Sequence, residues 1–123
     1  MELIYQEESF RIRGVLFEVY NNLGSGFSEI VYKDAIEQEL NLRQIPFARE
    51  EEYSVNYKGI VLEHKFYADF VLFDKIILEV KACEKLNSAH KSQCINYLKV
   101  SNNKLALLVN FSKERLEYDR VVH

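Results

Sequence analysis

The sequence predicts an α/β fold in which a mixed β-sheet is flanked by α-helices. Two helical patterns open the chain, several strand patterns follow, and a third helical pattern precedes a run of continuous apolar residues. Such an apolar run is typical of a strand that is covered on both faces of a sheet. This order of elements indicates a mixed sheet with helices packed against it.

We expect residues 1–123 to form a single domain. The chain has 123 residues, 48% of them hydrophobic, and eight Phe and eight Tyr are among them, which is enough to build a core. It has one Pro, four Gly and no low-complexity tract, so nothing in it resembles a linker between domains. The sequence therefore predicts one compact unit.

Two helices are predicted before any strand. Apolar residues between Ile12 and Leu23 recur three and four positions apart, which predicts an amphipathic helix that ends near Gly24. Ser28 is a suitable N-cap for a second helix that closes near Arg43, ahead of Pro46. We expect the two helices to form a hairpin.

Strand patterns begin after Phe47, where β-branched and aromatic residues flank a Lys58-Gly59 turn, the signature of a hairpin. A third helix fits residues 88–101, and the last strand is expected at an edge of the sheet. The expected strands cover residues 52–57, 60–62, 64–73, 76–81, 105–109 and 115–121.

The N-terminus lacks the basic and apolar regions of a signal peptide, and no apolar run has the length of a membrane span. We therefore expect a cytoplasmic protein with no membrane contact. Cys83 and Cys94 are too few for a disulfide framework or a zinc site. Both are expected to be packing residues.

The net charge of −3 and the pI of about 5.6 argue against a protein that coats nucleic acid by bulk electrostatics. The charge is unevenly distributed, because residues 81–104 carry five Lys and only one acid, Glu84. A polyanion would meet that segment first. A solvated helix face explains the same lysines equally well.

Charged residues interrupt the apolar strand patterns at Asp69, Glu79 and Lys81. An isolated carboxylate in an apolar environment costs several kcal/mol or more unless it is paired or holds a metal ion. Glu79 and Lys81 are two positions apart, so on a strand they project from the same face. These three residues are candidates for a functional site.

Polar residues also lie on the apolar stripes of two helices. Glu29 and Tyr32 share a face of the second helix, although Glu29 is explained equally by the helix dipole. His90, Gln93 and Tyr97 share a face of the third helix. A half-buried face, with polar groups bonded to backbone or water, accounts for any one of these three.

Taken together, the acids admit a metal-dependent mechanism. Asp69 and Glu79 supply hard oxygen ligands for Mg²⁺ or Mn²⁺, helped by the Val80 backbone carbonyl, and Glu29 binds the ion directly or through water. The metal would polarise a scissile phosphate and activate a bound water.

The remaining polar residues would act around that metal. Lys81 would orient the water or stabilise charge on the phosphorus oxygens. Gln93 and Tyr97 would position the backbone or the metal waters.

These residues carry a resemblance to a known family. Asp69 and Glu79-Val80-Lys81, with the preceding helical acid, resemble the core of the PD-(D/E)XK nuclease superfamily, although Ala68 stands where that core has Pro. Residues 26–32, Gly-Phe-Ser-Glu-Ile-Val-Tyr, match the motif that names the GxxExxY family, a bacterial and archaeal branch of the superfamily. Residues 93–97 resemble the Gln-X-X-X-Tyr motif of recombination-type exonucleases, and His90 also fits the GxxExxY family.

The resemblance implies a restriction-endonuclease-like sheet whose central strands carry the acids. It implies a metal-dependent nuclease acting on DNA, with Asp69 and Glu79 as ligands, Glu29 as an auxiliary ligand and Lys81 as the catalytic lysine. Tyr32 and His90 are auxiliary residues of that site. Two alternatives remain, a catalytically silent module that binds nucleic acid or oligomerises, and a nuclease that acts on RNA. A homodimer or a targeting partner would supply specificity, because no recognition element accompanies the site.

Overall fold

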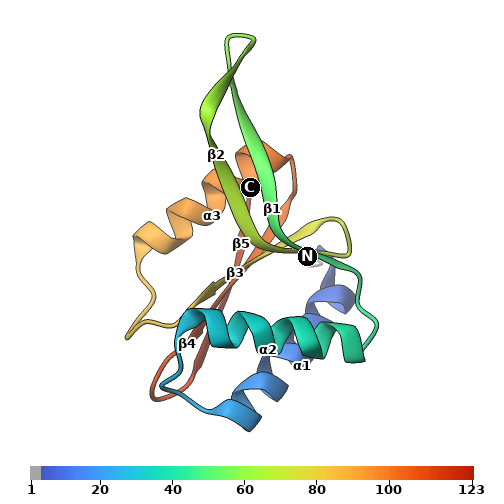
Figure 1. Cartoon of the computed structure of the whole chain (residues 1–123), viewed down its shortest axis with the longest axis vertical. Coiled ribbons are helices and arrows are strands. Elements are labelled where there is room, and N and C mark those ends of the chain that lie inside the picture. Colours follow the sequence, from blue (N-terminus) through green and yellow to red (C-terminus); the bar gives the residue numbers. More distant parts are fainter. Residues whose placement is uncertain (1–3) are drawn as a thin grey trace.

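The computed structural model describes residues 4–123 as three helices and one five-stranded sheet (Figure 1). The strands follow each other across the sheet in the order β1-β2-β3-β4-β5, and only β3 and β4 are parallel. The elements are α1 (Gln6–Leu23), α2 (Glu29–Leu42), β1 (Phe47–Tyr57), β2 (Ile60–Leu72), β3 (Ile76–Lys81), α3 (Ser88–Ser101), β4 (Leu105–Phe111) and β5 (Leu116–Val122).

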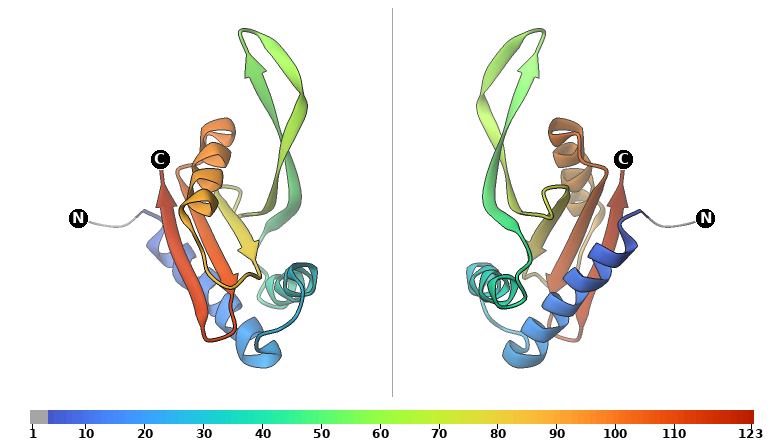
Figure 2. Two further views of the ribbon diagram at one scale, coloured as in Figure 1. Left: turned by 90° about the vertical axis from the view of Figure 1, so that its left-hand side faces the viewer. Right: turned by 90° about the vertical axis from the view of Figure 1, so that its right-hand side faces the viewer.

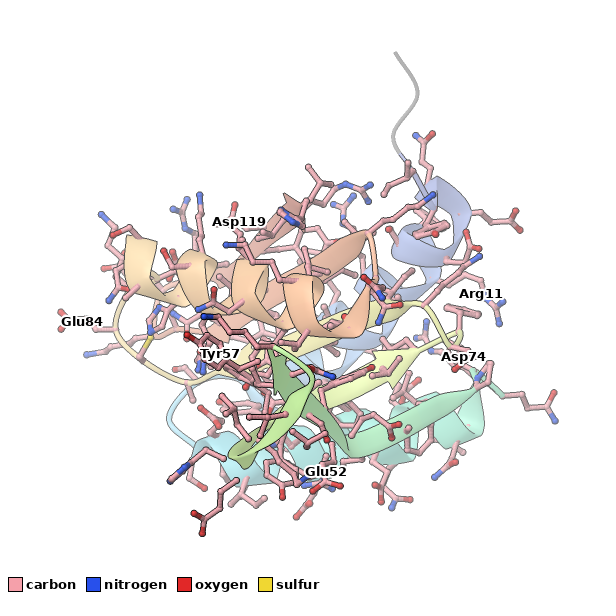
Figure 3. The ribbon with its side chains drawn as sticks, turned by 90° about the horizontal axis from the view of Figure 1, so that it is seen from above. Arg11, Glu52, Tyr57, Asp74, Glu84 and Asp119 are labelled. Carbon is pink, nitrogen blue, oxygen red and sulfur yellow. The ribbon has the colours of Figure 1, made fainter. Side chains whose placement is uncertain are left out.

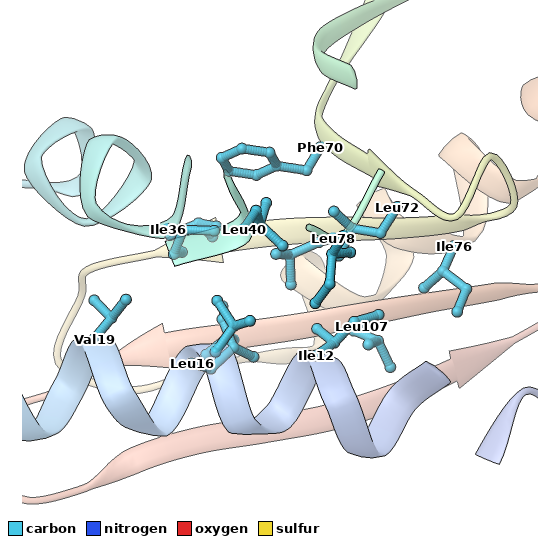
Figure 4. Packing of buried hydrophobic residues seen from close by; sticks show 14 of the residues in the cluster. Ile12, Leu16, Val19, Ile36, Leu40, Phe70, Leu72, Ile76, Leu78 and Leu107 are labelled. Carbon is cyan, nitrogen blue, oxygen red and sulfur yellow. The ribbon is translucent and has the colours of Figure 1, made fainter. Parts of the chain in front are cut away.

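The helices cover both faces of the sheet (Figure 2). Side chains of α1 and α2 pack with Leu78 and Leu107 in the larger core (Figure 4), whereas Cys94 and Leu98 of α3 pack with Ile77 in the smaller one. All seven residues of β4 are buried, because this strand lies between the two helical layers. The predicted mixed sheet with flanking helices is confirmed.

The predicted order of elements is confirmed, with two corrections in the first hairpin. The segments predicted at 60–62 and 64–73 form one continuous strand, β2, because a register shift between Ser54 and Asn56 absorbs the irregularity without breaking it. Strand β1 begins at Phe47 rather than at residue 52. The acidic residues before position 52 carry no strand signal, but Glu51 pairs with Ala68 of β2.

The β1–β2 and β2–β3 hairpins close on tight turns whose two central residues have positive φ. The turn at Lys58-Gly59 has φ of 52° and 84°, and the turn at Phe73-Asp74 has φ of 55° and 58°. This type I′ geometry matches the twist of the flanking strands. The outer half of the β1–β2 hairpin extends beyond the rest of the molecule, with Tyr57 near its end (Figures 1 and 3).

Side-chain burial also agrees with the predicted role of Cys94, which is fully buried in the smaller core. Both cysteines are free thiols, and Cys83 is half-buried. Within residues 4–123, no helix has the length and apolar character that a membrane crossing requires.

Candidate active site

Asp69 and Glu79 lie opposite each other on neighbouring strands. The regular β2–β3 pairing ends at Phe70 and Leu78, one residue before the two acids. Beyond that pair the carboxylates accept the backbone N–H groups instead: Asp69 N–H donates to Glu79 Oε1 at 3.0 Å, and Val80 N–H donates to Asp69 Oδ2 at 2.8 Å. Both residues are buried, Asp69 at 8% exposure and Glu79 at 2%. The sequence-predicted pair of acids is therefore brought together, each carboxylate bonded to the other strand.

The closeness of the two carboxylates affects their protonation. Burial, followed by the negative charge of Asp69, raises the pKa of Glu79 to about 8, against the opposing effects of its backbone hydrogen bond and Lys81. At neutral pH the Glu79 carboxyl of the metal-free protein is therefore mostly protonated. A divalent cation that bound both carboxylates would have to displace this proton.

Lys33 of α2 contacts the same site, although the sequence did not single it out. Its Nζ lies 2.9 Å from Asp69 Oδ1 and 2.5 Å from Glu50 Oε1, and the residue is 7% exposed. Burial lowers the pKa of Lys33, but the hydrogen bonds to Glu50 and Asp69 more than offset this, so the pKa is raised and the ammonium stays charged. The sequence does contain a sign that Lys33 is buried, because Lys33 lies on the same face of the helix as Ile36 and Leu40, which are buried.

Glu50, the second partner of Lys33, also belongs to the site. The β1–β2 register on either side of it, Arg49 with Phe70 and Glu51 with Ala68, places Glu50 opposite Asp69. Its backbone has φ of 55°, a left-handed conformation that is unusual for a residue within a strand. Glu50 stands in a run of three glutamates, so no pattern in the sequence distinguished it.

Helix α3 brings Gln93 to Lys81. The Lys81 ammonium donates to Gln93 Oε1 at 3.1 Å, and both residues are half-buried. This bond fixes the end of a flexible side chain two residues beyond Glu79. The structure thus joins two residues that the sequence placed in the site from separate motifs.

Tyr97, one helical turn further along α3, ties the helix to β2. Its hydroxyl donates to the Tyr67 carbonyl at 3.0 Å, and its ring meets Phe66 edge-on with centroids 5.3 Å apart. Burial, reinforced by the negative charges of Glu79 and Asp69, raises the pKa of Tyr97. The phenol is therefore neutral and holds α3 against the strand that carries Asp69.

Glu29 and His90 are not brought to the acid pair. Glu29 is the exposed first residue of α2 and makes no ion pair within the described part of the chain. His90 closes a capping box at the start of α3: its N–H donates to Asn87 Oδ1, and its Nδ1 accepts the Asn87 N–H. The geometry of His90 thus serves the helix end, and Glu29 has the placement that the helix dipole favours.

Tyr32 organises the loop that contains the Gly-to-Tyr motif. Its hydroxyl donates to the Gly24 carbonyl at 2.6 Å, and its ring stacks on Phe111 of β4 with centroids 4.2 Å apart. Gly24 and Gly26 have φ of 67° and 102°, conformations that a Cβ would strain. The motif therefore fixes the start of α2, the helix that carries Lys33, onto the sheet.

The donor set around Asp69 and Glu79 fits a hard divalent cation. Among residues 4–123, no three or more Asp, Glu, His or Cys side chains converge to form a metal-binding group. Mg²⁺, however, is commonly bound through one or two carboxylates and keeps several waters. Asp69 and Glu79 would hold it, with the Val80 carbonyl as an additional oxygen donor.

Comparison with known proteins agrees with this geometry. The family model described as the PD-(D/E)XK nuclease superfamily matches residues 6–121. The chain belongs to that superfamily. A solved structure described as "Crystal structure of SSO0001" has a similar fold, with a TM-score of 0.55 and 18% sequence identity, and the match covers 94% of this chain and 77% of that chain. No curated protein matches the chain. The PD-(D/E)XK assignment confirms the restriction-endonuclease-like fold class.

Proposed function

We propose that this chain is a metal-dependent nuclease that hydrolyses phosphodiester bonds in DNA, with Mg²⁺ or Mn²⁺ as its cofactor. The observation that carries the proposal is the buried pair of Asp69 and Glu79, with Lys81 two residues beyond on the same strand. Membership of a nuclease superfamily supports the reaction class.

Five residues of the site have a definite task in this reaction. Asp69 and Glu79 would hold the metal ion, which would supply a Lewis acid for the scissile phosphate and lower the pKa of a bound water. Lys81, held by Gln93, directs its ammonium toward the attacked phosphate and stabilises charge on its oxygens. Tyr97 keeps α3, and with it Gln93, in register with β2.

We assign the chain to the GxxExxY branch, because Tyr32, which bonds the Gly24 carbonyl, and Gly26, which has positive φ, give that motif a structural purpose. Glu29 remains proposed as an auxiliary ligand acting through water, and His90 as an auxiliary residue. Residues 1–123 are proposed to act as one cytoplasmic domain, with a second copy or a targeting partner supplying specificity.

A nuclease assay on the full chain tests this function. We expect cleavage of single- or double-stranded DNA with Mg²⁺ or Mn²⁺, none with EDTA, and a loss of roughly 100-fold or more in Asp69→Asn or Lys81→Met. The matched controls Asp119→Asn and Lys91→Met remove one exposed ion pair and should cleave like the parent. Circular dichroism confirms that each variant folds; a folded Asp69→Asn that still cleaves would refute the assigned role.

One observation favours the catalytically silent alternative. Asp69 already has a cation, the Lys33 ammonium, so the metal-free site is electrostatically satisfied. A silent module would show no calorimetric heat with Mn²⁺ that depends on Asp69, while its binding to DNA or RNA would survive Asp69→Asn. Including RNA in the substrate panel decides between the two nuclease alternatives.

A further inference from the structure

Lys33 lies in the path of any cation that approaches Asp69. Oδ2 of Asp69 accepts the Val80 N–H at 2.8 Å, and Oδ1 accepts from the Lys33 ammonium at 2.9 Å. Both oxygens of this carboxylate are therefore engaged. An ion that binds either oxygen comes within a few ångströms of the ammonium, and two cations at that distance in a buried site repel each other strongly.

Glu50 gives Lys33 a second place to bind. Its Oε1 is 2.5 Å from Lys33 Nζ, and 48% of its side chain is exposed, compared with 12% for Asp69. Glu50 lies opposite Asp69 in the β1–β2 pairing, and its backbone there is left-handed. If another cation binds Asp69, Lys33 still has Glu50 as a carboxylate partner with better access to water. Its ammonium is then not left buried without a counterion.

We propose that Lys33 is a built-in counterion of the metal site, which neutralises Asp69 in the metal-free protein and is retained by Glu50 when a divalent cation takes over Asp69. The proposal rests on the proposed function, since it requires a metal ion at Asp69 and Glu79. It assigns Lys33 and Glu50 a role in setting metal affinity. Neither is assigned a role in the chemical step.

Titration calorimetry with Mn²⁺ on the full chain measures this role. Lys33→Met removes the competing charge and should tighten Mn²⁺ binding by roughly 5- to 50-fold. Glu50→Gln leaves Lys33 with Asp69 as its charged partner and should weaken binding by roughly 3- to 10-fold. The control Lys91→Met removes an exposed lysine that is paired with Asp119 and should leave the affinity unchanged.

The double variant separates this proposal from its two rivals. If Glu50 acts through Lys33, Glu50→Gln has no further effect on Mn²⁺ binding in the Lys33→Met background. Weaker binding by the double variant than by Lys33→Met would mean that Glu50 is itself a ligand. Weaker binding by Lys33→Met than by the parent would mean that Lys33 only positions Asp69. Either of these results overturns the proposal.

A stability measurement covers variants that fold poorly. With EDTA, Lys33→Met and Lys33→Gln should lower the Tm, because Asp69 loses its counterion. With saturating Mn²⁺ this difference in Tm from the parent should disappear.

If the parent binds Mn²⁺ but Lys33→Met does not bind it more tightly, only the counterion proposal fails. If the parent binds no Mn²⁺, the proposed function fails, while binding gained by Lys33→Met and lost again with Asp69→Asn would still support the counterion. Absence of binding in all variants refutes both.

Discussion

Glu79 shows how a single buried residue links the site to the stability of the chain. Its pKa in the folded protein is raised from 4.5 to about 8, first by burial and then by the charge of Asp69. The folded state therefore binds a proton more tightly than the unfolded state. Without metal, the free energy of unfolding must fall as the pH rises from about 4.5 to about 8.

Glu79→Gln should remove this pH dependence. In EDTA, the parent should lose roughly 5 kcal/mol of stability relative to Glu79→Gln between the acidic and alkaline ends of that range, because each pKa unit corresponds to about 1.4 kcal/mol. Urea unfolding of both proteins at the two pH values measures the difference. The control Glu39→Gln removes a carboxylate that is paired with Arg43 on α2. Parallel pH profiles for the parent and Glu79→Gln would show that Glu79 is not perturbed.

Tyr32 belongs to the loop motif, and we expect its contribution to be structural. Tyr32→Phe keeps the stacking on Phe111 but loses the bond to the Gly24 carbonyl, which should cost about 1 kcal/mol. Mn²⁺ affinity and cleavage should be unchanged once the protein is folded. Tyr20→Phe, which loses a similar bond to the Ser112 carbonyl, is the matched comparison. A selective loss of Mn²⁺ binding in Tyr32→Phe would place Tyr32 in the metal site instead.

The residues of the site differ in how far the sequence could reveal them. Asp69 and Glu79 were predictable, because charges inside apolar strands need a partner and the short turn between the strands brings them opposite each other. Lys33 and Glu50 were not singled out, because their meeting with Asp69 depends on how α2 packs on β1 and β2. The spacing of residues in the sequence predicts contacts within one element and across tight turns. It holds little information about contacts between elements that are distant in the chain.

At the scale of elements, the turn between β2 and β3 places the acid pair. The Phe73-Asp74 turn joins the strands of Asp69 and Glu79, and both of its central residues have the left-handed conformation. Glycine adopts this conformation without the steric penalty of a Cβ, whereas Phe and Asp adopt it at a cost. The turn therefore holds the acid pair in register despite an unfavourable choice of residues.

Asp74→Gly should stabilise the chain. Asp74 is exposed, with φ of 58°, and Gly at the second central position is preferred in type I′ turns, so we expect a gain of about 0.5–1 kcal/mol. Gly59→Ala, at the same position of the other hairpin with φ of 84°, should destabilise by a similar amount. Thermal unfolding of the two variants checks the opposite signs. A lower Tm for Asp74→Gly would show that the Asp74 side chain itself supports the turn.

The elements themselves were largely predictable, since helix stripes and the apolar strand β4 follow from periodicity. The errors lie in the β1–β2 hairpin. Its outer residues are exposed on both faces, so no alternation of apolar and polar residues marks the strand. Backbone pairing and the register shift at Ser54 determine its path, and neither leaves a pattern in the sequence.

At the scale of the whole molecule, the net charge of −3 determines how a nucleic acid must be held. Attraction to phosphates from the chain alone is weak. A metal ion at Asp69 and Glu79, as proposed above, should therefore supply much of the binding, rather than the exposed lysines 85, 91, 99 and 104.

Binding to DNA should accordingly depend on a divalent cation. Fluorescence anisotropy with a labelled duplex should show at least tenfold tighter binding with Ca²⁺ than with EDTA, and Asp69→Asn should abolish the difference. Ca²⁺ serves as the probe because it favours oxygen ligands, as Mg²⁺ does. Equal binding with and without Ca²⁺, together with its loss when Lys91 and Lys99 are replaced by Glu, would favour the silent binding module.

The position of Lys33 in the chain also bears on how the protein is made. Lys33 precedes Asp69 by 36 residues, whereas Asp69 and Glu79 are separated by only 10. Synthesis proceeds from the N-terminus, so α2 leaves the ribosome before the strands of the acid pair do. Formation of the β2–β3 hairpin, a fast local step, brings the two carboxylates together. The Lys33 ammonium that pairs with Asp69 is by then already present in the nascent chain. An order of elements with α2 after β3 would lack this advantage.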